Sequence, residues 1–511
     1  MKAYYCLAIL CLCVVLPVTG AYISNALQFI NLINQRTPGE WTYGEVVNDL
    51  DFSNITLGKP LGLQTDGTCN PFKGTIKGNN YIIKGLRMNA LNGNAGLFCG
   101  LDEATIDNLF FDESCSFIGA ITGSLSVMAS GDVALFNVAN HGQVSGSSFS
   151  GGLIGYIMNT SDATIAFIDS VNSGTVTGKE NCTGGFVGSV QFIHNSLIMF
   201  DNEKNTGIID GHTGVGGLIG CVIKTSETSI FIDESTNHNK VIGGGAIGGF
   251  IGLIQNNTKM ELFIEKTINN STINASATKY KCQDGCGGIV GVIDSNEINV
   301  LLHQCTNNQT ISGLNQAGGL IGAIQTYNQK TIIETSDCMN KGVINSLGQS
   351  CGFISSLQND TNNIVIDIYN SKNEGNITGE YAYGIASSIR NGLNVVGMGF
   401  ATGFFASSSL WRSFLYMESC FVLDQNVQNA TTFTHCNLKC NFCIDNEAQE
   451  CVQDLLNLVS NSFASEHFLN WDEDLNLIEY ESVPSSGSFI KSSLVLLFSM
   501  FVFSLFSLFS N

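Results

Sequence analysis

Two sequence motifs recur in this chain in phase, and this repetition limits the possible folds more than any other feature. The first motif is Gly-Gly-apolar-apolar-Gly, which returns after 33, 32, 32, 39, 31, 33 and 32 residues. Its copies start at Gly151, Gly184, Gly216, Gly248, Gly287 and Gly318, with degenerate copies at Cys351 and Tyr383 and earlier ones at Ala95 and Gly119. Self-similarity at such a period is typical of a stacked array of structural units.

An asparagine column advances in step with the glycine motif. Its members are Asn140, Asn172, Asn205, Asn237, Asn269, Asn307, Asn340 and Asn373. Four residues after each lies a β-branched residue: Val144, Val176, Ile209, Val241, Ile273, Ile311, Ile344 and Ile377. We expect these Val and Ile side chains to stack inside the array, about 4.8 Å apart. We expect the Asn side chains to stack at one turn, in the left-handed conformation that Asn tolerates, and to bond to backbone and to each other.

The segments between the two columns have the composition of strands. Residues 163–169 and 228–233 are short, β-branched and aromatic. The 56 glycines would destabilise helices. The sequence therefore predicts an all-β repeat solenoid, a right-handed parallel β-helix of about ten coils of roughly 32 residues, with a C-terminal cap. Each unit should contain about three short strands, with the glycine pairs at tight corners.

Both ends of the chain resemble targeting segments. Residues 1–20 are expected to form a secretory signal peptide, because Lys2 precedes an apolar run and small residues precede Ala21. Near the other end, the small residues Ser485, Ser486, Gly487 and Ser488 precede an apolar tail over residues 494–509. This order predicts attachment of a glycosylphosphatidylinositol anchor within 485–511, and the alternative is a C-terminal membrane segment. Either would tether an extracellular body to the cell surface.

Between these ends we expect three regions. Residues 21–94 should form an N-terminal cap and the first coils, residues 95–390 the repeats, and residues 391–484 a cysteine-containing cap or stalk. In a secreted chain most cysteines should pair. The disulfide candidates are Cys282 and Cys286, which would pin an inserted loop, and the cluster Cys436, Cys440, Cys443 and Cys451, for which zinc is the alternative.

A family resemblance follows from these motifs. The Gly-Gly-Leu-Ile-Gly unit at 151–155 and its copies resemble the repeats of GLUG-motif surface and adhesin-type proteins. Residues 71–78, Pro-Phe-Lys-Gly-Thr-Ile-Lys-Gly, are similar to the segment that begins such arrays. The resemblance spans roughly residues 40–390. It implies surface adhesion or display, and it supplies no catalytic residues.

An enzyme is the alternative function, because β-helices also carry polysaccharide lyases and hydrolases. A lyase needs cations to hold an acidic sugar chain, yet no Arg lies between Arg87 and Arg390. A hydrolase needs converging carboxylates, and no two Asp residues are adjacent. We therefore expect a non-enzymatic protein without a cofactor. The net charge of -21 also argues against nucleic acid as a partner.

One group of acidic residues follows the repeat. Asp169, Asp201, Asp233 and Glu265 are spaced by 32 residues, and the next positions hold Gln304 and Thr335. The group is either a solvated strand edge or a stripe that binds calcium or sugar, because stacked carboxylates repel each other unless a cation lies between them. An extracellular glycan or protein is the expected ligand class.

Asn-x-Ser/Thr sequons are frequent, and some should be glycosylated in a secreted chain. The candidates are Asn54, Asn159, Asn181, Asn256, Asn270, Asn274, Asn308, Asn359, Asn376 and Asn429, and ladder residue Asn269 also begins a sequon.

Overall fold

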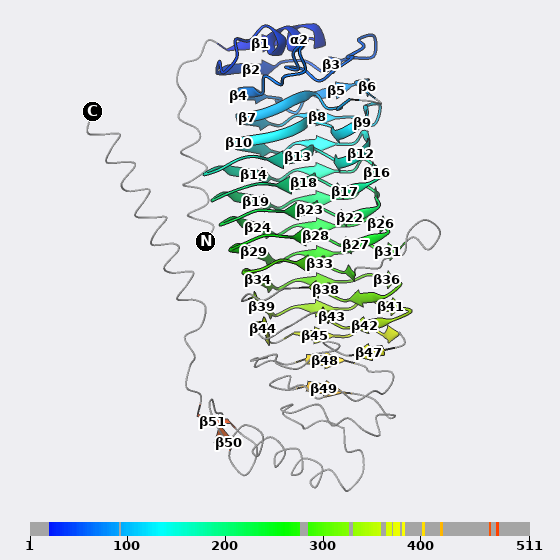
Figure 1. Ribbon diagram of the computed structural model, residues 1–511. Helices are drawn as coiled ribbons and strands as arrows, with labels where there is room; N and C mark the ends of the chain where they lie inside the picture. Colours follow the sequence, from blue (N-terminus) through cyan, green and yellow to red (C-terminus); the bar gives the residue numbers. More distant parts are fainter. Residues whose placement is uncertain are drawn as a thin grey trace, which may run out of the picture. The chain divides into compact units, whose positions relative to one another are not determined.

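The computed structural model is a β-solenoid of parallel strands stacked in about 10 turns, about 32 residues apart, which confirms the predicted fold class (Figure 1). It describes residues 20–383 except 91–92, 276–284, 326–330, 359–363, 370 and 379–380, and the short segments 401–403, 420–422, 470–471 and 477–479. The chain divides into two compact units, Met1–Ile444 and Asp445–Asn511. The described part of the second unit is an antiparallel pair, β50 (Asn470–Trp471) and β51 (Leu477–Glu479). The expected signal peptide, anchor region and most of the expected C-terminal cap lie outside the described residues.

Each regular coil contributes strands to three sheets. The first sheet takes two strands per coil, in two series: β13 (Ile154–Met158), β18 (Val187–Gln191), β23 (Ile219–Ile223), β28 (Ile251–Gln255), β33 (Val290–Asp294), β38 (Ile321–Gln325) and β43 (Ile354–Gln358), then β14 (Thr164–Ile168), β19 (Leu197–Asp201), β24 (Ser229–Asp233), β29 (Met260–Glu265), β34 (Ile298–His303), β39 (Thr331–Ser336) and β44 (Ile364–Tyr369). The second takes one two-residue strand per coil: β11 (Ala139–Asn140), β15 (Val171–Asn172), β20 (Lys204–Asn205), β25 (Thr236–Asn237), β30 (Ile268–Asn269), β35 (Thr306–Asn307), β40 (Met339–Asn340) and β45 (Lys372–Asn373).

The third sheet again takes two short strands per coil. These are β16 (Val176–Gly178) and β17 (Asn181–Gly184), β21 (Ile209–Asp210) and β22 (Thr213–Gly216), β26 (Val241–Gly243) and β27 (Gly245–Gly248), β31 (Ile273–Ala275) and β32 (Cys286–Gly287), β36 (Ile311–Gly313) and β37 (Gln316–Gly318), β41 (Ile344–Ser346) and β42 (Gln349–Cys351), and β46 (Ile377–Thr378) and β47 (Tyr381–Tyr383). The expectation of about three strands per unit was wrong, because a regular coil contains five strands, two in the first sheet, one in the second and two in the third.

The first coils are less regular. Their strands are β1 (Ala21–Ile23), β2 (Thr42–Val46), β3 (Leu50–Asp51), β4 (Phe72–Lys77), β5 (Ile82–Lys84), β6 (Arg87–Asn89), β7 (Phe98–Asp107), β8 (Phe110–Phe111), β9 (Ser116–Gly123), β10 (Ser126–Phe136) and β12 (Gln143–Gly151). Near the other end, β48 (Ala401–Gly403) pairs in parallel with β49 (Cys420–Val422).

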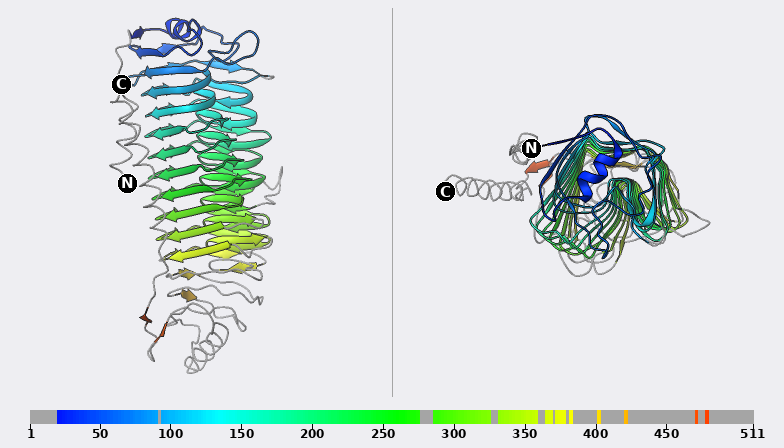
Figure 2. Two further views of the ribbon diagram at one scale, coloured as in Figure 1. Left: turned by 60° about the vertical axis from the view of Figure 1, so that its left-hand side comes forward. Right: turned by 90° about the horizontal axis from the view of Figure 1, so that it is seen from above.

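Helix α2 (Ala26–Asn34) covers the N-terminal end of the stack (Figure 2). Its N-cap is Asn25, whose side chain accepts the backbone N–H of Gln28 at 3.0 Å. The helix buries Ala26, Phe29 and Ile33, and the ring of Phe29 lies 5.9 Å from that of Phe98 in β7. An end cap of this kind is needed because an open coil would expose unpaired backbone groups.

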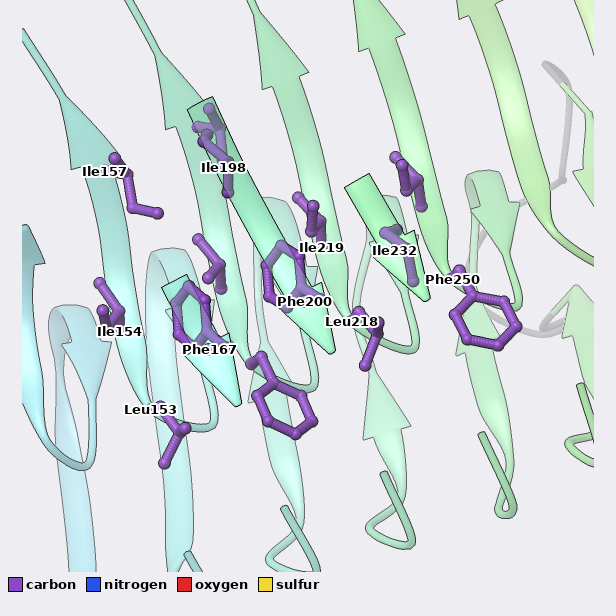
Figure 3. Close-up of a cluster of buried hydrophobic side chains, with 14 of the residues drawn as sticks. Leu153, Ile154, Ile157, Phe167, Ile198, Phe200, Leu218, Ile219, Ile232 and Phe250 are labelled. Carbon is purple, nitrogen blue, oxygen red and sulfur yellow. The ribbon is translucent and has the colours of Figure 1, made fainter. Parts of the chain in front are cut away.

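Aliphatic and aromatic columns fill the interior. The predicted Val and Ile column is confirmed: each member from Val144 to Ile377 pairs in register with the next, and all eight are buried. Other inward columns hold Leu153 and Phe250, and Phe167 stacks on Phe200 at 4.5 Å (Figure 3). These columns belong to one cluster of buried hydrophobic residues that extends through the described coils.

The predicted asparagine ladder is confirmed as a hydrogen-bonded stack. Each side-chain Nδ2 donates to the Oδ1 of the next Asn, from Asn140 to Asn373, over seven successive bonds of 2.6–3.4 Å. Most members also donate to the carbonyl two residues further on, as Asn172 does to Gly174 at 3.1 Å. The expected left-handed conformation was wrong. The ladder residues are buried strand residues, and the positive-φ column lies at the preceding corner, at Asn137, Asp169, Asn202, Glu234, Lys266, Gln304 and Asp337.

The glycine pairs lie where two parts of the coil approach closely. A Cβ atom on Gly185 would come within 2.0 Å of the carbonyl oxygen of Gly217 and 2.9 Å of the side chain of Asn205. Gly152 has the same relation to Gly185 and to Asn172. Any side chain at these glycines would collide with the next coil and with a ladder Asn. The glycine motif and the asparagine ladder therefore recur with the same period.

Two disulfides join the described coils, and sequence reasoning named neither. Cys69 bonds to Cys99, and Cys182 bonds to Cys221. Cys286 is also disulfide-bonded, as expected. Its expected partner Cys282, and the cluster Cys436, Cys440, Cys443 and Cys451, lie outside the described residues.

Candidate functional surface

The outer face of β19, β24, β29 and β34 carries the acidic group found in the sequence. Side chains alternate along each strand, so that Ile198 and Phe200 of β19 point inward, whereas Leu197, Met199 and Asp201 belong to the outward set. Successive coils are in register, so each outward position forms a column along the solenoid. The outward side chains of these four strands therefore form three columns. The first contains Leu197, Ser229, Glu261 and Asn299.

Three of the four predicted acidic residues form one column, which we call the acid row: Asp201, Asp233 and Glu265. Asp169 does not belong to it, because its neighbour Ile168 pairs with Asp201. Asp169 instead occupies the left-handed corner, where its Oδ1 accepts a bond of 2.6 Å from Asn202. The next positions were also wrong: the row continues into His303 and Ser336, not Gln304 and Thr335.

A lysine partly neutralises the acid row. Nζ of Lys266 lies 2.8 Å from a carboxylate oxygen of Glu265 and 3.9 Å from Oδ1 of Asp233. Partial burial raises the pKa of Asp233, Lys266 opposes this effect, and the carboxylates of Glu265, Glu234 and Asp201 reinforce it. The hydrogen bond to Glu265 raises the pKa of Lys266. The ammonium group of Lys266 therefore lies beside two of the carboxylates for which the sequence suggested calcium binding.

Beside the acid row runs an apolar column, which we call the apolar ridge: Met199, Phe231, Phe263 and Leu301. The rings of Phe231 and Phe263 stack at 4.6 Å with an interplanar angle of 13°. Met199 is buried, and the other three are partly exposed. The ridge therefore places three partly exposed apolar side chains in one line on the outer face of the sheet.

A second internal ladder was missed by sequence reasoning. Two residues before each ladder Asn from Asn172 to Asn373 lies a small polar residue, cysteine or acid: Ser170, Glu203, Ser235, Thr267, Cys305, Cys338 and Ser371. At several steps the backbone N–H of one coil donates to the side chain of the next, for example at 3.1 Å from Glu203 to Ser235 and 3.4 Å from Cys305 to Cys338, whereas the Thr267 hydroxyl has no hydrogen-bond partner. We call this set the relay column. Its sequence signal is the fixed offset from the asparagine column.

Glu203 is the one carboxylic acid of the relay column. It is fully buried, and its Oε2 accepts the N–H of Ser170 while Oε1 has no hydrogen-bond partner. Burial raises its pKa well above the usual range, and the nearby carboxylates of Asp169 and Asp201 raise it further. Burial of a carboxyl without a cationic partner favours its neutral form over the charged one.

The described residues contain no group of three or more His, Cys, Asp or Glu side chains arranged to hold a metal ion. The carboxylates of the acid row lie side by side along the solenoid axis instead of converging on one point.

Most sequon residues lie at the surface. Those that are exposed are Asn54, Asn159, Asn181, Asn256, Asn274 and Asn376, whereas Asn270 and Asn308 are partly exposed. Asn269 is buried in the ladder. Asn359, Asn429 and the anchor candidates Ser485, Ser486, Gly487 and Ser488 lie outside the described residues. Within the part of the chain that the structure describes, no helix is long and apolar enough to cross a bilayer.

Comparison with known proteins adds little to this description. No family model and no curated protein matches the chain. One similar solved structure is a candidate immunoglobulin A1 protease from Bacteroides ovatus, with a TM-score of 0.36 and 16% identity over 64% of this chain and 84% of that chain. Another is described as an IgA1 protease, with a TM-score of 0.24 and 14% identity over 74% of this chain and 21% of that one. Likenesses this distant carry no argument about function.

Proposed function

We propose that this protein is a non-enzymatic display or adhesion protein of the cell surface, of the GLUG-motif type, tethered to the membrane near its C-terminus. The observation that carries the proposal is the apolar ridge beside the acid row. A stacked scaffold repeats one outward position in every coil, which turns single side chains into an extended contact surface. The ridge brings partly exposed apolar side chains next to charged ones, and apolar surface bordered by polar residues is typical of surfaces that bind a partner.

Binding by the isolated ectodomain tests the adhesive role. Residues 22–484, produced in a secretory host, should bind to the surface of intact cells in a saturable manner. The same protein with Phe231→Ser and Phe263→Ser should lose most of this binding while its circular dichroism stays unchanged. Equal binding by both proteins, or reproducible turnover of polysaccharides by the ectodomain, would contradict the proposal.

Enzymatic release tests the tether. A phosphatidylinositol-specific phospholipase should release the full-length protein from cells if a lipid is attached at or near Ser485–Ser488. Retention after complete digestion, with the apolar tail peptide still detectable, would indicate a spanning helix in its place.

A further inference from the structure

We propose that the apolar ridge and the acid row together bind a basic polypeptide segment that also carries aliphatic side chains. This inference rests on the proposed adhesive function and names the class of its partner. The surface consists of Phe231, Phe263 and Leu301 in one column and Asp201, Asp233 and Glu265 in the next.

The geometry of the ridge favours a polypeptide over a glycan. Sugar rings and free cations bind to the faces of aromatic rings. Here Phe231 and Phe263 cover one face of each other, and their in-register neighbours on the opposite sides are Met199 and Leu301. Ring edges and aliphatic atoms are what remain for contact. Such a strip suits aliphatic side chains better than it suits a sugar.

The negative charge of the acid row favours a positively charged partner. Three carboxylates in register repel each other, and Lys266 neutralises only part of that charge because its bond at 2.8 Å is to Glu265 and its distance to Asp233 is 3.9 Å. A lysine or arginine from outside would lower this repulsion. The net charge of -21 would also attract a basic segment over longer distances.

The strands that form this face contain no sequon. The exposed candidates Asn159 and Asn256 both lie at the corner that follows the β13 series of strands, and Asn181 and Asn274 lie on the third sheet. No sequon falls within residues 197–201, 229–233, 260–265 or 298–303. The strands of the ridge and the row would therefore carry no glycan of their own.

The test uses the ectodomain and a labelled synthetic peptide of alternating lysine and leucine, measured by fluorescence anisotropy. A peptide of alternating glutamate and leucine and one of alternating lysine and serine test charge and apolar contact separately, and neither should bind comparably. Phe231→Ser with Phe263→Ser should weaken binding of the lysine-leucine peptide about tenfold, from lost apolar burial. Asp201→Asn with Asp233→Asn should weaken it about threefold to tenfold, and added salt should do the same. Lys266→Gln should strengthen it about twofold to fivefold, because it removes a competing cation.

The matched control is Asp210→Asn, which makes the same chemical change at an exposed residue of β21 on the third sheet. It should leave peptide affinity unchanged. Equal loss in this control and in the single variant Asp201→Asn would overturn the proposed site, because the effect would then come from net charge. If the ectodomain binds cells and a neutral glycan through the ridge but ignores the lysine-leucine peptide, the partner class is wrong and the adhesive function stands. If the ectodomain binds no cell surface at all, the adhesive function itself fails.

Discussion

The backbone N–H of Ser170 donates a hydrogen bond of 3.1 Å to the side-chain Oε2 of Glu203 in the next coil. In the neighbouring steps of the relay column a hydroxyl has this role: Ser170 accepts from Val138, and Ser235 accepts from Glu203, each at 3.1 Å. A carboxyl therefore replaces a hydroxyl at one point of an otherwise neutral internal ladder, where burial raises its pKa.

Glu203→Gln should remove a pH dependence from unfolding. Burial raises the pKa of Glu203 in the folded chain above its unfolded value. The stability that the protonated carboxyl contributes is thus complete below the usual glutamate range and is lost as pH rises through the folded pKa. Urea unfolding from mildly acidic to alkaline pH should show this decline in the natural chain and a flatter profile in the variant. Glu180→Gln, at an exposed residue, is the control, and an unchanged profile in the Glu203 variant would contradict the prediction.

Ile209→Asn and Ile311→Asn should each destabilise the solenoid by roughly 2–5 kcal/mol, from lost burial and an amide without a partner. Both side chains are fully buried in the Val and Ile column. Because coils contact only their neighbours, hydrogen exchange should increase first in the mutated coil and the two beside it. Uniform exchange along the whole array would show that the coils do not behave as a nearest-neighbour stack.

Asn205→Ala should cost about 1–3 kcal/mol, more than one net hydrogen bond, because it leaves buried groups on both sides unpaired. Asn172 loses its acceptor at 2.8 Å, and Asn237 loses its donor at 2.8 Å. Chemical denaturation measures the change. Asn181→Ala, at an exposed residue of β17, should have an effect near zero, and a similar loss in both variants would refute the ladder's role.

Gly185→Ala should destabilise the fold by about 1–3 kcal/mol or more, as overpacking does. The added Cβ would meet the backbone of Gly217 at 2.0 Å, which a side-chain rotation cannot relieve. Gly58→Ala is the matched control, since a Cβ atom added there would have nothing within 4 Å. Thermal unfolding should separate the two variants, and equal midpoints would show that the coils can separate locally.

Cys182→Ala with Cys221→Ala should lower the free energy of unfolding by about 2–4 kcal/mol. The disulfide joins residues 39 positions apart and links neighbouring coils. A reducing agent should destabilise the natural chain and have less effect on the double variant. Cys115→Ala changes a buried cysteine outside any disulfide and controls for loss of sulfur packing.

The sequence by itself determined the architecture. A period of 32 or 33 residues in two columns specifies a stack, and one β-branched residue per period specifies an inward position, because in-register coils bring equivalent residues together. The contents of the Val and Ile column and the bonding of the Asn ladder could be predicted for this reason. The relay column could have been found by the same method, at its fixed offset from each Asn.

Only the tertiary structure decided how residues outside these columns align. The coil that runs from β14 to β19 contains one more residue than the coil that follows. Val176 pairs with Ile209, which is 33 residues later, whereas Asn181 pairs with Thr213, which is 32 residues later. The extra residue lies at the corner between β16 and β17, which falls between Asp169 and Asp201 in the sequence. It moves Asp169 out of the acid row, so a constant spacing of 32 gave the wrong partner. Corner residues set the register, and counting along the chain does not show which corner absorbs an added residue.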